Sequence, residues 1–320
     1  MDFLVIKLGL IGFSDENGHP YSFSAIINGY EDELMRNSGW GVIADYLSLA
    51  PPNKFGIHNC KITHIWTQDN EISRQISAIS RIENICEAPE EMIGAVDGVI
   101  IARDDWESHL KLAQIFLERD IPVFVDKPLT LDLSELKYFS KFLDSGLLMS
   151  CSGFRFATEL DDFSFNLENL KFVSLTVVND FSKYGIHVLE ALASIDRYFI
   201  NPSSITRINA SSDIFVFEYP NGTTMSLTCL GSASKTFELD FFGKEKNSSV
   251  TIQDNFGAFK QTLTYFVQMV NSRTITIPPN DTIKLMLILI AGNQLTKGST
   301  VDFNNFLSSF EESGLTDASK

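Results

Sequence analysis

The sequence has few cysteines, no long apolar run and no leader-like segment. Its four cysteines, Cys60, Cys86, Cys151 and Cys229, are scattered and form no Cys-x-x-Cys pair. This spacing argues against a zinc site or a disulfide framework, so we expect buried thiols in a reducing compartment. No apolar run approaches the length of a membrane span, and residues 1–12 lack the basic flank and cleavage site of a signal peptide. We therefore expect a cytoplasmic protein without a membrane partner.

Basic residues are also scarce. The 25 Lys and Arg residues face 41 Asp and Glu residues, which gives a formal net charge of −16 at pH 7. Such a chain is a poor ligand for nucleic acid, so no nucleic-acid partner is expected. What is present is a globular composition, 44% hydrophobic and 21% charged, over 320 residues, enough for two domains with separate cores.

Two patterns of apolar residues divide the chain. Before residue 128, apolar strands alternate with helical segments, and this predicts a parallel sheet that is covered on both faces. Its strands are predicted at residues 3–12, 61–67, 82–86, 99–102 and 121–125. After residue 128, strands are predicted at 147–154, 171–178, 204–210, 213–219, 223–230, 235–243 and 248–253, with helices at 184–198, 256–271 and 280–296. There the apolar period of two is typical of an antiparallel sheet with one covered face.

The predicted fold class is therefore α/β. An N-terminal Rossmann-type doubly wound parallel sheet occupies residues 1–127, and an α+β domain with a large, mainly antiparallel open sheet occupies residues 128–320.

The first strand ends in an incomplete glycine motif. The motif contains Gly9, Gly12 and Ser14; if Gly12 is the first glycine of the full G-x-G-x-x-G fingerprint, Ser14 stands at the second. A glycine at this turn lets the backbone approach a pyrophosphate at a helix N-terminus. The carboxylates of Asp15 and Glu16 oppose that use. Dinucleotide binding and an ordinary strand-to-helix turn both remain open on this motif alone.

The ends of the next strands carry polar side chains. If a cofactor ribose is held, the second strand offers Thr67, Gln68 or Asp69, although Asp69 can equally cap the helix at 70–80. No basic residue occurs from Thr67 to Asn70, which favours NAD slightly over NADP. Ala102 and Arg103 follow the fourth strand and are predicted to line the same edge. His109 opens a helix there, and it either caps that helix or lines the pocket.

A lysine follows the fifth strand. The apolar run at 121–125 stops at Asp126-Lys127-Pro128, because proline cannot donate to a strand ladder and disfavours helical geometry in the residue before it. An amine at the carboxyl end of a buried parallel strand lies where open α/β sheets bind ligands.

Four segments in this order carry a resemblance to a known family. They are Val99–Leu129 with its Asp126-Lys127-Pro128 turn, Phe154-Arg155-Phe156, Gly185-x-His187-x-x-Glu190, and Thr262–Phe303. Together they resemble the Gfo/Idh/MocA family of NAD(P)-dependent sugar and polyol oxidoreductases. No single motif is specific, but their order and spacing together are. The resemblance covers nearly the whole chain apart from the long first crossover.

The resemblance implies a role for each matching residue. Lys127 would bridge cofactor and substrate, and His187 would be the general acid or base. Gly9, Gly12, Ser14 and Asp126 would face the cofactor, and Arg155 and His109 would lie on the substrate side. The family commonly has Asp four residues before the histidine, where this chain has Lys183, a further candidate for the catalytic base.

The resemblance leaves three functions open. The first is hydride transfer between NAD or NADP and a hydroxyl or keto group of a sugar-like substrate. Because Lys127 and Lys183 are both cations, that substrate is expected to be anionic, such as a sugar acid or a nucleotide-linked sugar. The second is a lyase or hydrolase that uses the same cofactor, and the third is a non-catalytic sugar sensor whose cofactor loop has decayed.

A homodimer or homotetramer is predicted through the C-terminal sheet. Phe215, Phe217, Phe237, Phe241 and Phe242 are expected to give it apolar surface on both sides. An exposed face of that kind would be a large apolar patch for a monomer.

Overall fold

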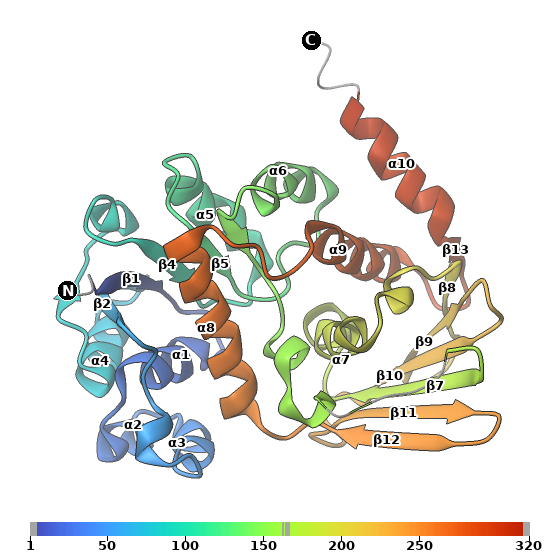
Figure 1. Cartoon of the computed structure of the whole chain (residues 1–320), viewed down its shortest axis with the longest axis horizontal. Coiled ribbons are helices and arrows are strands. Elements are labelled where there is room, and N and C mark those ends of the chain that lie inside the picture. Colours follow the sequence, from blue (N-terminus) through green and yellow to red (C-terminus); the bar gives the residue numbers. More distant parts are fainter. Residues whose placement is uncertain (1–4, 162, 164–166, 316–320) are drawn as a thin grey trace. The chain divides into compact units, whose positions relative to one another are not determined.

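A computed structural model describes residues 5–161, 163 and 167–315, and these fold into two compact units (Figure 1). Unit 1 comprises residues 1–129, 139–151 and 255–277, and unit 2 comprises residues 130–138, 152–254 and 278–320. Each unit thus draws on three separated segments, whereas each predicted domain is continuous. Among the described residues, no helix is long and apolar enough to cross a membrane.

Unit 1 is built on a six-stranded parallel sheet. In the order β3-β2-β1-β4-β5-β6, its strands are Asn84–Ile85, Cys60–Trp66, Ile6–Ile11, Gly98–Ile101, Val123–Val125 and Leu148–Met149. This is the strand order of a doubly wound nucleotide-binding sheet, so the predicted fold class is confirmed for this half. Every residue of β4 and β5 is buried, as expected of strands covered on both faces. Phe3 and Leu4, which the predicted first strand included, lie outside the described residues.

The predicted strand at 147–154 was wrong in extent and in place. Only Leu148–Met149 is a strand, and it pairs with β5 in the first sheet. The apolar run continues through Cys151 and Phe154, but Gly153–Phe156 forms a 3-10 turn (η4) because the Ser152 side chain caps it. A period-two pattern cannot reveal such a capped turn.

Helices of unit 1 come from both halves of the chain. They are α1 (His19–Asn28), α2 (Asp32–Asn37), α3 (Gly41–Leu47), α4 (Asn70–Ser80), α5 (His109–Leu117) and α8 (Asn255–Ser272), with 3-10 turns η1 (Pro52–Lys54), η2 (Pro89–Met92) and η3 (Trp106–Ser108). Helix α8 was predicted to close the C-terminal domain, and this was wrong. It packs on α1, where the rings of Phe23 and Phe259 lie 5.3 Å apart, and Phe266 lies 5.9 Å from Phe124 of β5.

Unit 2 is built on a seven-stranded, mainly antiparallel sheet, which confirms the second half of the fold class. In the order β12-β11-β7-β10-β9-β8-β13, its strands are Asn247–Thr251, Phe237–Gly243, Leu170–Val177, Thr224–Cys229, Asp213–Glu218, Ser204–Arg207 and Thr300–Asp302. Only β7 and β10 pair in parallel. Its helices are α7 (Phe181–Ile195), α9 (Pro279–Gln294) and α10 (Phe303–Leu315), with 3-10 turns η4, η5 (Thr158–Leu160) and η6 (Arg197–Ile200). Helix α6 (Leu133–Leu143) is shared between the two units.

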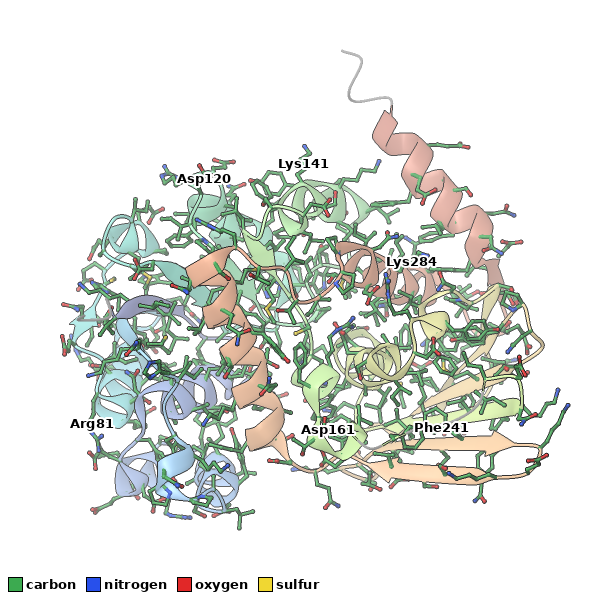
Figure 2. The ribbon with its side chains drawn as sticks, viewed as in Figure 1. Arg81, Asp120, Lys141, Asp161, Phe241 and Lys284 are labelled. Atoms are coloured by element: carbon green, nitrogen blue, oxygen red, sulfur yellow. The ribbon has the colours of Figure 1, made fainter. Side chains whose placement is uncertain are left out.

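One face of this sheet carries α7, and the phenylalanines are mostly on that face. Phe215, Phe217 and Phe241, the last labelled in Figure 2, are at most 2% exposed. Phe237 also points inward, because its ring lies 4.7 Å from that of Phe154. Of the five phenylalanines named above, only Phe242 belongs to the outer face, with 42% exposure. The prediction that they supply apolar surface to both sides therefore depends, for the outer face, on Phe242 alone.

Candidate functional site

The carboxyl ends of β1, β2, β4 and β5 gather the candidate residues of unit 1. Parallel strands end at one edge of their sheet, and this edge is where ligands bind in open α/β folds. The residues that follow these strands are Gly12 and Ser14 after β1, Thr67, Gln68 and Asp69 after β2, Ala102 and Arg103 after β4, and Asp126 and Lys127 after β5. The sequence analysis thus names residues that the structure brings to one edge, with Gly9 as an exception.

Lys127 lies in a buried polar cluster. Its Nζ is 3.8 Å from Asp104 Oδ2, and the two side chains are only 5% and 10% exposed. Ser14 Oγ donates to Asp104 Oδ1 at 2.8 Å and accepts from the Asp104 backbone N–H at 3.1 Å. The loops after β1, β4 and β5 therefore hold the ammonium in a defined place, and a carboxylate balances its charge.

Asp126 anchors the start of α1. Its Oδ2 accepts from His19 Nδ1 and, at 3.3 Å, from Asn17 Nδ2, while its Oδ1 accepts from the Lys127 N–H at 2.8 Å. Burial alone raises the pKa of this carboxyl, but His19 and Lys127 outweigh burial and hold the pKa below its ordinary value. Asp126 is therefore an ionised structural anchor beneath the loop at 12–18.

A second network joins the loops after β1, β2 and β4. The Gln68 amide pairs with the Phe13 backbone, accepting from its N–H at 2.9 Å and donating to its carbonyl at 2.5 Å. Arg103 Nη1 donates to the same Gln68 oxygen at 2.8 Å. The Arg103 Nε and Nη2 atoms donate to the two oxygens of Asp105, at 2.8 and 2.6 Å. A guanidinium thus lies beside the end of β2, although no basic residue occurs from Thr67 to Asn70.

Two other residues after β2 have local partners. The Thr67 hydroxyl bonds to Ser73 Oγ at 2.9 Å and to the Asp69 carbonyl. Asp69 caps α4 by accepting from the Glu71 N–H at 2.9 Å, which is the structural alternative left open above. Gln68 and Arg103 are therefore the better-placed side chains for a ribose at this corner.

Packing explains three glycines in and after β1, each through a different neighbour. Gly9 lies inside β1, where an added Cβ would meet Met92 Sδ at 2.5 Å, so packing accounts for it and it does not line the turn. Gly12 lies at the turn itself, where a Cβ would meet Pro20 of α1 at 3.0 Å. Gly18, which the prediction omitted, precedes α1, and a Cβ there would meet Ile43 at 2.5 Å.

The loop at 12–18 can hold a phosphate through its backbone. Glu16 adopts a left-handed conformation (φ 63°), and within the described part of the chain the Asp15 and Glu16 N–H groups donate to no protein acceptor. Successive N–H groups in such a turn make an anion-binding concavity. The side chains of both residues are exposed, so their charges can point into solvent. This loop and the Gln68–Arg103 corner fit the phosphate and ribose parts of a dinucleotide.

His109 is fully buried and serves neither of its two predicted roles in the described contacts. Its Nδ1 lies 3.0 Å from the Leu129 carbonyl oxygen and its Nε2 lies 2.9 Å from that of Arg103. The ring therefore ties the loop after β4 to the turn after β5. A direct contact with substrate stays a prediction.

His187 is the candidate proton carrier of unit 2. It is 6% exposed, and its ring lies 5.0 Å from that of Phe154, 5.4 Å from Phe237 and 5.6 Å from Tyr184. Its Nδ1 is 2.6 Å from Ser152 Oγ, which also accepts from the Phe154 N–H at 3.2 Å. Ser152, missed by the sequence analysis, therefore fixes which ring nitrogen faces the protein. The pairing of His187 with Lys127 spans the two units and stays a prediction.

Arg155 belongs to a buried ion network. Its Nη1 bonds to Glu190 Oε2 at 2.5 Å and its Nη2 to Asp281 Oδ2 at 2.6 Å, while Arg197 Nε bonds to the other Asp281 oxygen at 2.7 Å. These contacts indicate that Arg155 joins η4 to α7 and α9. Its predicted substrate contact stays a prediction. Lys183 lies one turn before His187, where its backbone N–H donates to the cap residue Asp180 at 3.0 Å.

The geometry agrees with a comparison of the sequence with known families. Residues 39–146 match the family described as "Oxidoreductase family, NAD-binding Rossmann fold", Gfo/Idh/MocA. Over these residues, about a third of the chain, the sequence is similar to the Gfo/Idh/MocA family. The predicted resemblance is therefore supported over this region, and the matched family is described as one of oxidoreductases with an NAD-binding Rossmann fold. A search of curated proteins finds no match.

Solved structures match the fold of nearly the whole chain. The scyllo-inositol dehydrogenase of Lactobacillus casei is 13% identical, with a TM-score of 0.70, over 95% of this chain and 100% of that one. Its crystal structure with bound NAD(H) and scyllo-inositol has a TM-score of 0.68 at 13% identity, over 94% and 99% of the two chains. The myo-inositol dehydrogenase of Corynebacterium glutamicum is 14% identical, with a TM-score of 0.67, over 93% and 98%. At these identities the likeness shows the fold.

Four residues that sequence reasoning missed act through the side chains to which they bond. His19 and Asn17 bond to Asp126, Asp104 bonds to Ser14, and Asp105 bonds to Arg103. Asp104 and Asp105 could have been found, because they follow a buried strand on the ligand-binding edge. Nothing in the sequence pairs His19 with Asp126.

Proposed function

We propose that this protein transfers a hydride between a nicotinamide dinucleotide and a hydroxyl or keto group of a sugar-like polyol. One observation carries the proposal: a buried lysine ammonium, Lys127, lies at the carboxyl end of β5 in a Rossmann unit, within the residues that match an oxidoreductase family. The polyol class is supported by the inositol dehydrogenases among the structural neighbours.

The residues of unit 1 that would hold the cofactor are the loop at 12–18 for its phosphates and Gln68 with Arg103 for a ribose. When bound, the nicotinamide accepts or supplies the hydride. Asp126 contributes indirectly, because its bonds to His19 and Asn17 hold the loop against the start of α1.

His187 is proposed to exchange the proton of the reacting hydroxyl. Ser152 Oγ lies at 2.6 Å from Nδ1, so the proton transfer is assigned to Nε2. In the direction of alcohol oxidation Nε2 takes the proton, and the resulting imidazolium donates from Nδ1 to Ser152. In the direction of reduction the same atoms work in reverse.

Lys127 is proposed to donate to the reacting oxygen and to stabilise the negative charge that develops there. The Asp104 carboxylate balances the positive charge of the Lys127 ammonium, and the Ser14 hydroxyl orients that carboxylate. A preorganised cation in a buried site is more effective than a mobile one, because it does not have to reorganise during the reaction.

A neutral polyol is favoured over the anionic sugar considered from the sequence. That expectation rested on Lys127 and Lys183 as two cations. Because Asp104 balances Lys127, the anionic alternative depends on Lys183 alone.

The proposal predicts both cofactor binding and oxidation of a polyol. NADH fluorescence should change on titration with the protein, and a panel that includes myo-inositol and scyllo-inositol should yield a keto product with NAD or NADP. The His187→Asn variant is the matched control, because it should bind NADH but give no product. Failure to bind either cofactor would favour a non-catalytic sugar-binding protein. Cleavage of the substrate without net oxidation would favour a lyase or hydrolase.

The proposal includes a homodimer or homotetramer formed through the outer face of the unit 2 sheet. Phe242, 42% exposed, lies 6.1 Å from the ring of Phe172 on the neighbouring strand β7, so the two form an apolar pair. Phe242→Glu should shift light-scattering mass toward the monomer. Leu49→Glu is the matched control, since Leu49 is 84% exposed and belongs to unit 1. A parent protein that is monomeric at micromolar concentration would contradict this part of the proposal.

A further inference from the structure

The corner at the end of β2 contains an ion pair that the sequence does not suggest. Arg103 and Asp105 come from the loop after β4, yet Arg103 Nη1 reaches Gln68, two residues after β2, at 2.8 Å. The Arg103 side chain is 12% exposed and that of Asp105 is 33% exposed. In doubly wound folds this corner contacts the ribose that distinguishes NAD from NADP.

Besides Gln68, two further partners fix the Arg103 guanidinium. Its Nε donates to Asp105 Oδ1 at 2.8 Å and to Ser108 Oγ at 3.0 Å, and its Nη2 donates to Asp105 Oδ2 at 2.6 Å. Burial tends to raise the pKa of the Asp105 carboxyl, but the bonds to Arg103 outweigh it, so the pKa lies below its ordinary value. Asp105 is therefore ionised at neutral pH and balances the arginine.

An arginine near this corner normally accommodates the 2′-phosphate of NADP. Here the Asp105 carboxylate accepts hydrogen bonds from both Nε and Nη2 of Arg103, so this edge of the guanidinium faces Asp105. A 2′-phosphate would have to displace that carboxylate or lie beside it, and like charges repel. A 2′-hydroxyl carries no such penalty, and Gln68 offers it an amide.

We propose that Asp105 determines the preference for NAD over NADP by engaging Arg103, the cation that bonds to Gln68 at the ribose corner. This inference rests on the proposed function, because it requires that a dinucleotide binds at this edge. Asp105 itself acts through Arg103, so removal of its charge should convert the corner into a 2′-phosphate site.

The test is titration of NADH and NADPH, each followed by nucleotide fluorescence. Asp105→Asn should improve NADPH binding by about tenfold or more, while NADH binding changes by less than about threefold. Adding Arg103→Gln to that variant should abolish the gain, since no cation would then meet the phosphate. Asp213→Asn is the matched control, because it breaks a similar Arg–Asp pair in unit 2, with Arg207 Nε 2.8 Å from Asp213 Oδ1, and should leave the ratio of the two affinities unchanged.

The outcomes separate this inference from the proposed function. If the parent binds neither nucleotide, the proposed function fails. If the parent binds NADH but Asp105→Asn leaves the NADPH to NADH ratio within about twofold of the parent, the role of Asp105 is wrong and the proposed function stands. Circular dichroism establishes that Asp105→Asn is folded; if it is not, Asp105→Ser is titrated in its place with the same expected gain.

Discussion

Lys127→Met and His187→Asn are each expected to lower kcat by about 10²- to 10⁴-fold, the range typical of a lost general acid–base group. The lysine variant keeps an unbranched apolar stem but loses the ammonium, and the histidine variant keeps a polar group but loses the proton acceptor. This decrease in kcat corresponds to an increase of roughly 3 to 5.5 kcal/mol in the activation free energy. Cofactor binding should stay within a few-fold of the parent in both, because neither side chain is assigned to the phosphate loop or the ribose corner.

Loss of Lys127 has a second consequence that must be separated from catalysis. In Lys127→Met, the carboxylate of Asp104 stays buried without its cation, which destabilises unit 1. The double variant Lys127→Met/Asp104→Asn removes both charges. It should regain stability relative to the single variant but should not regain turnover.

Residues of the same types that lie outside the proposed site supply the controls. Lys111→Met changes an exposed lysine of α5, and His64→Asn changes a half-buried histidine of β2; both should retain the parent kcat. Turnover by His187→Asn within about tenfold of the parent would contradict the assignment, and Lys183 would then be the next candidate for the base.

The edge of the sheet could be predicted from the sequence because strand ends are local features. The apolar run that stops at Pro128 and the run that stops before Arg103 each mark a strand terminus, and parallel strands bring their termini together. This is why Ser14, Arg103 and Lys127 were found. The partners within the edge could not be predicted, since the bonds from Ser14 to Asp104 and from His19 to Asp126 depend on loop conformation.

Errors in the fold have a similar cause. The apolar periodicity of α8 identifies a helix correctly but does not say which sheet the helix covers. In the structure Phe259 packs against Phe23 and Phe266 packs against Phe124, both in unit 1. Gly9 illustrates the limit of motif reasoning. It was predicted to face the cofactor, yet contact with Met92 explains why no side chain is tolerated there.

The buried network around Arg155 carries the second large expectation. Glu190 lies three residues after His187 on α7, and Arg155 lies three residues after Ser152, so the ion pair at 2.5 Å holds the two elements that place His187 against Ser152. Arg155→Met would leave the carboxylates of Glu190 and Asp281, each 1% exposed, without the guanidinium that joins them. Breaking a buried pair from one side typically costs about 3–5 kcal/mol of unfolding free energy.

This loss should depend on pH in a known direction. Burial raises the pKa of Glu190 above its ordinary value, Arg155 opposes that shift and Asp281 adds to it. A carboxyl whose folded pKa is raised contributes stability that is fully present below its unfolded pKa, about 4.3, and is lost as the pH rises through the folded pKa. Removal of Arg155 raises that pKa further. The deficit of Arg155→Met should therefore be largest near neutral pH and should shrink as the pH falls toward that of the unfolded carboxyl.

The positions of the tryptophans allow the effect to be localised. Trp40, Trp66 and Trp106 all belong to unit 1, so tryptophan fluorescence reports unit 1, while hydrogen exchange of α7 and β7 peptides reports unit 2. Arg155→Met should speed exchange in α7 and leave the fluorescence midpoint in urea nearly unchanged. Arg74→Met, which breaks the exposed pair with Glu71 on α4, is the control and should change neither readout. Arg155→Met/Glu190→Gln should recover part of the lost protection, because a neutral amide replaces the unpaired charge. Exchange in α7 that matches the parent at neutral pH would contradict the structural role of Arg155 and return it to the list of substrate ligands.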